Sequence, residues 1–118
     1  MRHTITIDEN EIAHVKIIGD GDVNVAREFV TAAEKLFKQH PGKNFCGIVD
    51  MLESGTSDYD GIKIYREFLK NKRLRKVAFV ITNPVIKAFV KIATEFKKDV
   101  EFFETTKEAE DWIVSNCL

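Results

Sequence analysis

Carboxylate side chains are the first candidates for chemistry in this sequence, because they gather where predicted strands end. They are Asp20, Asp22, Asp50, Glu53, Asp58 and Asp60. Ligands of open α/β sheets bind beyond the carboxyl ends of the strands, and a hard divalent cation prefers oxygen ligands. Solvated loops and two helix caps explain the same residues more simply. We favour this second interpretation, so the sequence predicts no metal ion and no cofactor.

A second set of residues has the types found in phosphoacceptor receivers. Asp50 follows a predicted buried strand, Thr82 follows the next strand and Lys107 follows the last. Asp20 and Asp22 would then hold magnesium. A receiver, however, has a strand–helix unit between its acidic pair and its phosphorylated aspartate, whereas here one helix alone separates the two. A receiver-like phosphoacceptor at Asp50 is therefore only an alternative.

Motifs of the common enzyme classes are missing from the sequence. It contains no Walker A loop, no Gly-x-Gly-x-x-Gly and no Gly-x-Ser-x-Gly. Its three histidines form no cluster with the spacing of metal ligands. We therefore expect a protein that is not an enzyme.

Charge is divided along the chain. The 118 residues include 18 basic and 19 acidic ones, for a net charge of -1. Residues 63–98 hold 11 basic and 2 acidic side chains, a net of +9, and the remainder holds 7 basic and 17 acidic ones, a net of -10. The basic part does not suggest nucleic acid, because its aromatic residues alternate poorly with its charges and the whole chain is not basic.

The apolar face of the helix predicted over residues 85–98 is unusually wide. At 100° per residue its apolar side chains cover an arc of about 160°, against the roughly 100° that a core contact needs. Part of this arc is therefore uncovered or covered by a movable neighbour. A basic amphipathic helix next to the basic run 70–76 is attracted to an anionic membrane surface. A core helix with a solvated lysine face is the competing interpretation.

Aromatic side chains border this basic sector on two consecutive helices. A cleft between these helices would be apolar with a cationic mouth, and it would suit a fatty acid or phospholipid. Ordinary core packing is again the alternative. The expected ligand-binding residues are Tyr65, Phe68, Phe89 and Phe96 for apolar contact and Arg66, Lys70, Arg73, Lys87 and Lys91 for anionic groups.

The cysteines and the hydropathy pattern bear on the compartment. Cys46 lies in an apolar run far from Cys117, so we expect a buried, reduced thiol and a reducing environment. No apolar run approaches the roughly 20 residues that cross a bilayer, and the start of the chain lacks the apolar stretch of a signal peptide. We expect a cytoplasmic protein whose membrane contact, if present, is peripheral.

The hydropathy periods predict nine elements in a single domain, residues 1–118. Strands are expected at 4–7, 12–18, 45–49, 76–81 and 100–103, and a polar loop at 53–61. Helices are expected to begin at caps formed by Asp22, Ser57, Asn83 and Thr105, the second and fourth with capping boxes. A hairpin followed by alternating helices and strands predicts an α/β fold, on the border with α+β, with a mixed five-stranded sheet and four helices.

Three stretches of this pattern resemble the STAS domain of anti-sigma-factor antagonists and sulphate-transporter tails, and its SpoIIAA-like branch most closely. They are residues 15–20, 47–50 and 107–113. Antagonists carry Asp-Ser-Ser-Gly at the start of the helix after the third strand, and a partner kinase phosphorylates one serine. The matching residues here are Asp-Tyr-Asp-Gly at 58–61, so Asp60 takes the phosphoacceptor position as a permanent charge. The regulatory loop implied by the resemblance comprises Ser57, Asp58, Asp60 and Gly61.

The SpoIIAA-like resemblance implies a function without catalytic residues. Such proteins are thought to bind apolar or lipid-like ligands and to associate with membranes through movable helices. A lipid-like ligand or an anionic membrane surface is therefore the leading expectation. A regulatory protein partner, as in antagonists, is the alternative, and a homodimer is compatible with either.

Overall fold

A five-stranded sheet forms the centre of the computed structural model, which describes residues 2–118. Its strands are β1 (Arg2–Ile7), β2 (Ile12–Gly21), β3 (Phe45–Ser57), β4 (Leu74–Val80) and β5 (Val100–Phe103). They lie in the sheet in chain order, β1 antiparallel to β2 and each later strand parallel to the one before it. The predicted α/β class, element order and mixed sheet are confirmed.

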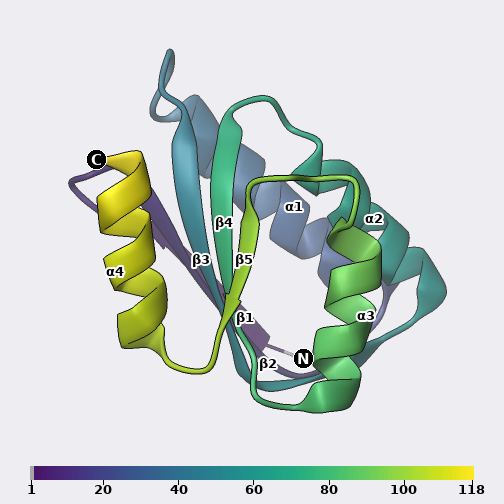
Figure 1. The fold of residues 1–118 in the computed structure, drawn as a ribbon. Helices are drawn as coiled ribbons and strands as arrows, with labels where there is room; N and C mark the ends of the chain where they lie inside the picture. The colour runs from purple at the N-terminus through teal and green to yellow at the C-terminus, as the bar shows by residue number, and fades with distance from the viewer. Residues whose placement is uncertain (1) are drawn as a thin grey trace.

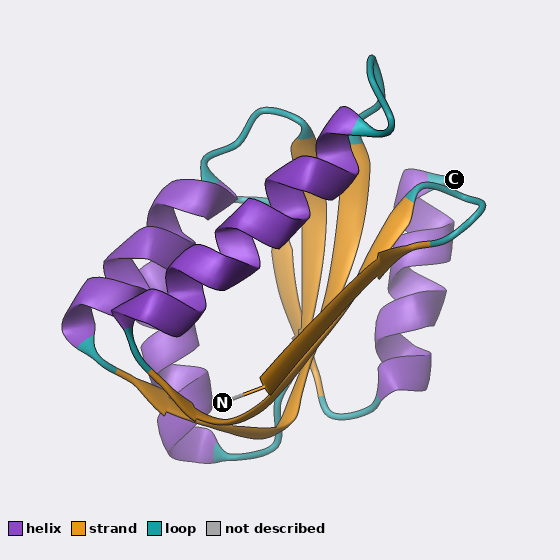
Figure 2. Ribbon diagram, turned by 180° about the vertical axis from the view of Figure 1, so that it is seen from behind, coloured by secondary structure: helices purple, strands orange, loops and turns teal. Residues whose placement is uncertain are grey.

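Helices cover both faces of this sheet, three on one side and one on the other (Figures 1 and 2). They are α1 (Val23–Lys38), α2 (Tyr59–Leu69), α3 (Pro84–Thr94) and α4 (Thr106–Cys117). Right-handed crossovers that advance in one direction across a sheet place every connecting helix on the same face, here α1, α2 and α3. The last helix, α4, returns to the opposite face.

Alternation along β4 shows how the two faces are filled. Val77 and Phe79 pack with Ile86 of α3 and Phe68 of α2, whereas Ala78 and Val80 pack with α4 on the opposite face. Both faces of the central strands are thus buried, as their continuous apolar runs predict. Residues of β2 on the first face, such as Val15 and Ile17, pack against α1.

Side-chain caps fix where three of the helices begin, as predicted. Asp22 accepts hydrogen bonds from the backbone N–H groups of Asn24 and Val25, and Asn83 accepts from the second and third residues after it, with Pro84 between. Thr105 accepts from the N–H of Glu108, and the two side chains are also hydrogen-bonded, at 2.9 Å. Each cap satisfies N–H groups that have no partner within the helix.

The third strand corrects two predictions. β3 continues through Ser57, although its second half is polar and was expected to be a loop from Glu53 to Gly61. The reason is pairing: β2 also continues past Ile18, and its Gly21 pairs with Ser57. The cap of α2 is consequently Asp58, which accepts a 2.7 Å hydrogen bond from the N–H of Gly61, and not Ser57.

α3 is also shorter than expected and ends at Thr94.

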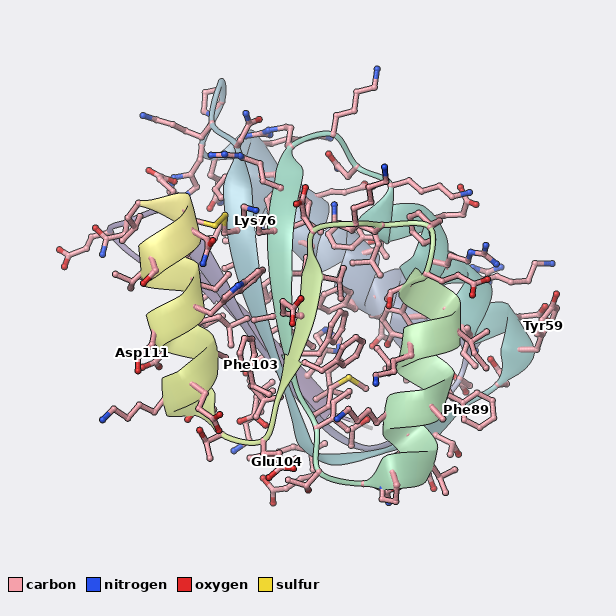
Figure 3. All side chains as sticks on the ribbon, in the orientation of Figure 1. Tyr59, Lys76, Phe89, Phe103, Glu104 and Asp111 are labelled. Atoms are coloured by element: carbon pink, nitrogen blue, oxygen red, sulfur yellow. A yellow bond between two sulfur atoms is a disulfide. The ribbon has the colours of Figure 1, made fainter. Side chains whose placement is uncertain are left out.

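The two cysteines form a disulfide, so the expected free thiol is wrong. Cys46 at the start of β3 is bonded to Cys117 in the last turn of α4. In Figure 3 this bond lies at the C-terminal end of α4, close to the label of Lys76. A separation of 71 residues hides this pairing in the sequence, because only the return of α4 across the sheet brings the two residues together. The expectation of a reducing compartment rested on a free thiol, so the disulfide removes that argument.

We predict that Cys117→Ser lowers the free energy of unfolding by about 4 kcal/mol, the loop-closure entropy expected for this separation. Denaturant unfolding of the variant and of the wild type, each with and without reductant, measures the difference. Reductant should bring the wild type to the level of the variant and leave the variant unchanged. Equal stability of oxidised and reduced wild type would contradict the prediction.

Candidate functional site

The apolar face of α3 is only partly covered. Ile86 and Thr94 are its buried residues, whereas Val85, Phe89 and Ile92 are 60%, 56% and 66% exposed. Phe89 and Tyr59 both project at the edge of the molecule formed by α2 and α3 (Figure 3). The wide apolar arc of this helix therefore extends beyond its packing surface, as predicted.

A cavity of about 170 Å³ lies between the sheet and helices α1, α2 and α3. Its sheet wall includes Val15, Val49 and Val77, and its helix walls include Phe29 and Phe68. An apolar cavity of about 150 Å³ in another protein stays dry and binds benzene, so this volume suits an apolar segment of a ligand.

One end of the cavity is polar. It is bordered there by Ser54, Thr56 and Ser57 of β3. The hydroxyl oxygen of Ser57 is buried and has no hydrogen-bond partner among the described residues. Gly61 in α2 leaves room for it, since a Cβ at this position would lie 2.4 Å from the Ser57 hydroxyl oxygen.

Tyr65 of α2 also lines the cavity and carries a phenol hydroxyl. Burial, with a smaller contribution from the charge of Asp22, raises its pKa to about 12. The phenol is therefore neutral at physiological pH and retains its proton as a hydrogen-bond donor. It also lies against the ring of Phe29, with centroids 5.6 Å apart.

The nine ligand-binding residues predicted from the sequence separate into two groups. Tyr65, Phe68, Phe89 and Arg66 line the cavity. Phe96, Lys70, Arg73, Lys87 and Lys91 do not. The cavity also uses Ile5 of β1, Ala13 of β2 and Phe37 of α1, which we did not predict as site residues. The alternation of β1 and β2 and the helical spacing of α1 indicated that these three residues are buried. Neither pattern indicated that they line a cavity.

Arg73 has a structural role that the sequence did not reveal. Its guanidinium donates hydrogen bonds to three backbone carbonyls, that of Phe37 in the last turn of α1 and those of His40 and Lys43 beyond its end. It also lies over the ring of Phe45, 5.1 Å from the centroid. Since its donors are used by the protein itself, we remove Arg73 from the proposed ligand contacts.

The other cations have different surroundings. Lys70 forms a 2.9 Å ion pair with Glu67, and Lys91 lies over the ring of Phe102. Lys87 is half-buried on α3. Arg66 lies over the ring of Phe96, with its guanidinium carbon 5.5 Å from the centroid.

The carboxylates at the strand ends serve local structure. Asp20 accepts a 2.8 Å hydrogen bond from the N–H of Thr56, Asp50 accepts one from Leu52, and Glu53 pairs with Lys16 at 3.2 Å. Within residues 2–118 no three histidine, cysteine, aspartate or glutamate side chains are arranged to hold a metal ion. Hydrogen bonds to backbone N–H groups, one ion pair and the caps at Asp22 and Asp58 account for five of the six carboxylates, and Asp60 is exposed.

Asp50 is not placed as in a receiver. It lies in the interior of β3, opposite Lys16 of β2 and Val80 of β4, and the strand continues for seven more residues to Ser57. The predicted position at a strand end is wrong, because pairing with the extended β2 lengthens β3. The carboxylate is also occupied by the N–H of Leu52. We therefore give up the receiver alternative.

Comparisons with solved structures identify the architecture. An uncharacterized protein of the DUF3478 family with a SpoIIAA-like fold, from Shewanella loihica PV-4, matches with a TM-score of 0.74 and 16% identity, over 93% of this chain and 92% of that one. The anti-sigma factor antagonist SpoIIAA in its unphosphorylated form matches with a TM-score of 0.70 and 11% identity, over 96% and 98%. The chain has the SpoIIAA-like fold. The sequence itself matches no protein-family model and no curated protein.

In this fold, the predicted regulatory loop lies at the junction of β3 and α2. Asp58 caps α2, and Asp60 is exposed in the first turn of that helix. A negative charge in the first turn is favoured by the helix dipole, so Asp60 needs no partner to be accommodated. Gly61 is buried and faces Ser57 and Asp58.

We predict that Arg73→Met lowers the free energy of unfolding by about 2–3 kcal/mol, because it removes charge-assisted hydrogen bonds to carbonyl groups. Denaturant unfolding measures the loss. Arg75→Met is the matched control: Arg75 is exposed in β4, two residues after Arg73, and its change should stay within about 0.5 kcal/mol. Similar losses in the two variants would argue against a specific role for Arg73.

Proposed function

We propose that the protein is a non-enzymatic SpoIIAA-like domain that binds an apolar or lipid-like ligand in the cavity between the sheet and α1–α3. The observation that carries this proposal is the cavity of about 170 Å³ with walls made almost wholly of apolar side chains. Well-packed domains rarely leave such a space, because each unfilled void forfeits packing contacts. A ligand that fills it recovers those contacts.

The surroundings of α3 support entry from the side of α2. The two helices border the cavity through Ile62, Tyr65 and Leu69 on α2 and Phe89 and Val90 on α3. The exposed fraction of Phe89 shows that the apolar wall continues to the surface. A chain longer than the cavity can therefore remain in apolar contact beyond it. Each methylene group that leaves water contributes about 0.8 kcal/mol, so affinity should grow with chain length until the cavity is filled.

We predict that Val90→Phe weakens binding of the neutral fluorescent probe N-phenyl-1-naphthylamine at least about tenfold, because a ring directed from this half-buried lining position occupies space that the ligand needs. Val85→Phe is the matched control, since Val85 is on the same helix but 60% exposed and outside the cavity wall. Probe fluorescence titration gives the affinity, and thermal unfolding checks that both variants fold. Unchanged binding in Val90→Phe, or no binding to the wild type, would contradict the cavity as the site.

A peripheral contact with an anionic membrane is a second candidate, favoured by the exposed apolar side chains of α3. Val85, Phe89 and Ile92 form an apolar surface on a helix that also carries Lys87 and Lys91. Such a helix is held by apolar insertion together with attraction to acidic head groups. No helix within residues 2–118 is long and apolar enough to cross a bilayer, so the proposed contact is with the membrane surface.

We predict that the protein floats with vesicles containing phosphatidylglycerol and not with phosphatidylcholine vesicles alone. Flotation should decrease at about 1 M salt, where the Debye length falls to about 3 Å. Phe89→Ser combined with Ile92→Ser should abolish it. Val114→Ser on α4, an exposed apolar residue on the other face of the sheet, should not. Equal flotation with the two kinds of vesicle would count against this candidate.

A regulatory protein partner is a third candidate, supported by the structural likeness to the anti-sigma factor antagonist SpoIIAA. The contact would use the region of Asp58, Asp60 and Gly61 at the start of α2. With Asp60 in the phosphoacceptor position, this surface would carry a constant negative charge and would not respond to a serine kinase. This candidate is compatible with ligand binding: the partner would contact the start of α2, whereas later residues of the same helix line the cavity.

A further inference from the structure

Arg66 differs from every other described residue in the cavity wall. The side chains that line the cavity are apolar, apart from a few hydroxyl groups and Arg66, the one residue with a formal charge. No carboxylate lines the cavity among the described residues. A group that enters from the side of α2 and α3 therefore meets one cation and no opposing anion.

The guanidinium of Arg66 is not used by the protein in the way that Arg73 is used. Within residues 2–118, Arg66 makes no ion pair, and its described contact is with the ring of Phe96. That ring is 37% exposed and also lies near the ammonium of Lys70, 5.7 Å from the centroid. A cation–π contact at an exposed site is weak, whereas a guanidinium fork can form two parallel charge-assisted hydrogen bonds with a carboxylate. A carboxylate can therefore replace Phe96 as the partner of Arg66.

Two acidic groups close to Arg66 or Tyr65 already have partners. Glu67, next to Arg66 on α2, is paired with Lys70. Asp22, whose charge acts on Tyr65, accepts the N–H groups at the start of α1. The mouth of the cavity near Arg66 consequently favours an anion over a neutral head group.

We infer that Arg66 selects ligands with an anionic head, and that the ligand class is a single aliphatic chain ending in a carboxylate or an equivalent anion. The chain lies in the cavity, and the head displaces Phe96 from the guanidinium. This inference rests on the proposed function, because it assumes that an apolar chain enters the cavity. Phe96 acts through Arg66 as a competitor of the head group, because its ring contacts the guanidinium when no ligand is bound.

The test compares two amphiphiles of equal chain length, decanoate and decanol, as competitors of N-phenyl-1-naphthylamine at about pH 8, where the carboxylic acid is ionised. We expect the wild type to bind decanoate about fivefold more tightly than decanol, the effect of a partly solvated charge-assisted contact. Arg66→Gln should remove this preference and change decanol affinity less than twofold. Phe96→Leu should increase decanoate affinity by about twofold to fivefold, because the competing ring is gone.

Lys63→Gln is the matched control for loss of one positive charge on α2. Lys63 lies over the ring of Tyr59 and outside the cavity wall, so the variant should keep the preference for decanoate. A preference that survives in Arg66→Gln, or that Lys63→Gln removes equally, overturns the assignment of Arg66 and leaves the proposed cavity standing. Failure of the probe and both amphiphiles to bind the wild type overturns the proposed function as well.

Discussion

Along its inner face, α3 packs against the sheet through Ile86 and Val90, which join Leu74, Val77 and Phe79 in one apolar cluster. The stacked rings of Phe79 and Phe102 lie in the same cluster and add bulk to the sheet beneath the helix. The remaining large apolar side chains of α3 are left facing α2 or solvent. The cavity, its opening and the exposed surface of α3 all depend on this incomplete contact between one helix and the sheet.

The other helices are held by more specific contacts, so the incomplete packing is confined to α3. α1 is capped by Asp22 at its start, and Arg73 donates to a carbonyl in its last turn and to one just beyond its end. α4 is fixed by the disulfide from Cys117 to Cys46 and by packing of Ala109 and Ile113 on the sheet. A rigid frame with one partly docked helix suits a binding protein, because the sheet keeps the cavity in place while α3 has few contacts to lose when a ligand enters.

The structure shows which of the unevenly distributed basic residues already have partners. At least three of the eleven basic residues of the 63–98 segment have partners within the protein: Arg73 binds carbonyls, Lys70 binds Glu67, and Lys97 donates to the carbonyl of Leu74. Charge segregation in the sequence therefore overstates the number of cations available for a ligand. Arg66 is distinguished by where it lies and not by the basic run to which it belongs.

Periodicity and capping determined most of the fold from the sequence. The apolar runs of β3 and β4, the Asn83-Pro84 start of α3 and the Thr105–Glu108 capping box are local signals, and local physics decided them. Tertiary structure alone decided the rest. Pairing of β2 with β3 converted a polar segment into strand, and the return of α4 joined two cysteines 71 residues apart. The cavity belongs to this second group, because a void is a property of how three helices meet a sheet, and no single stretch of residues encodes it.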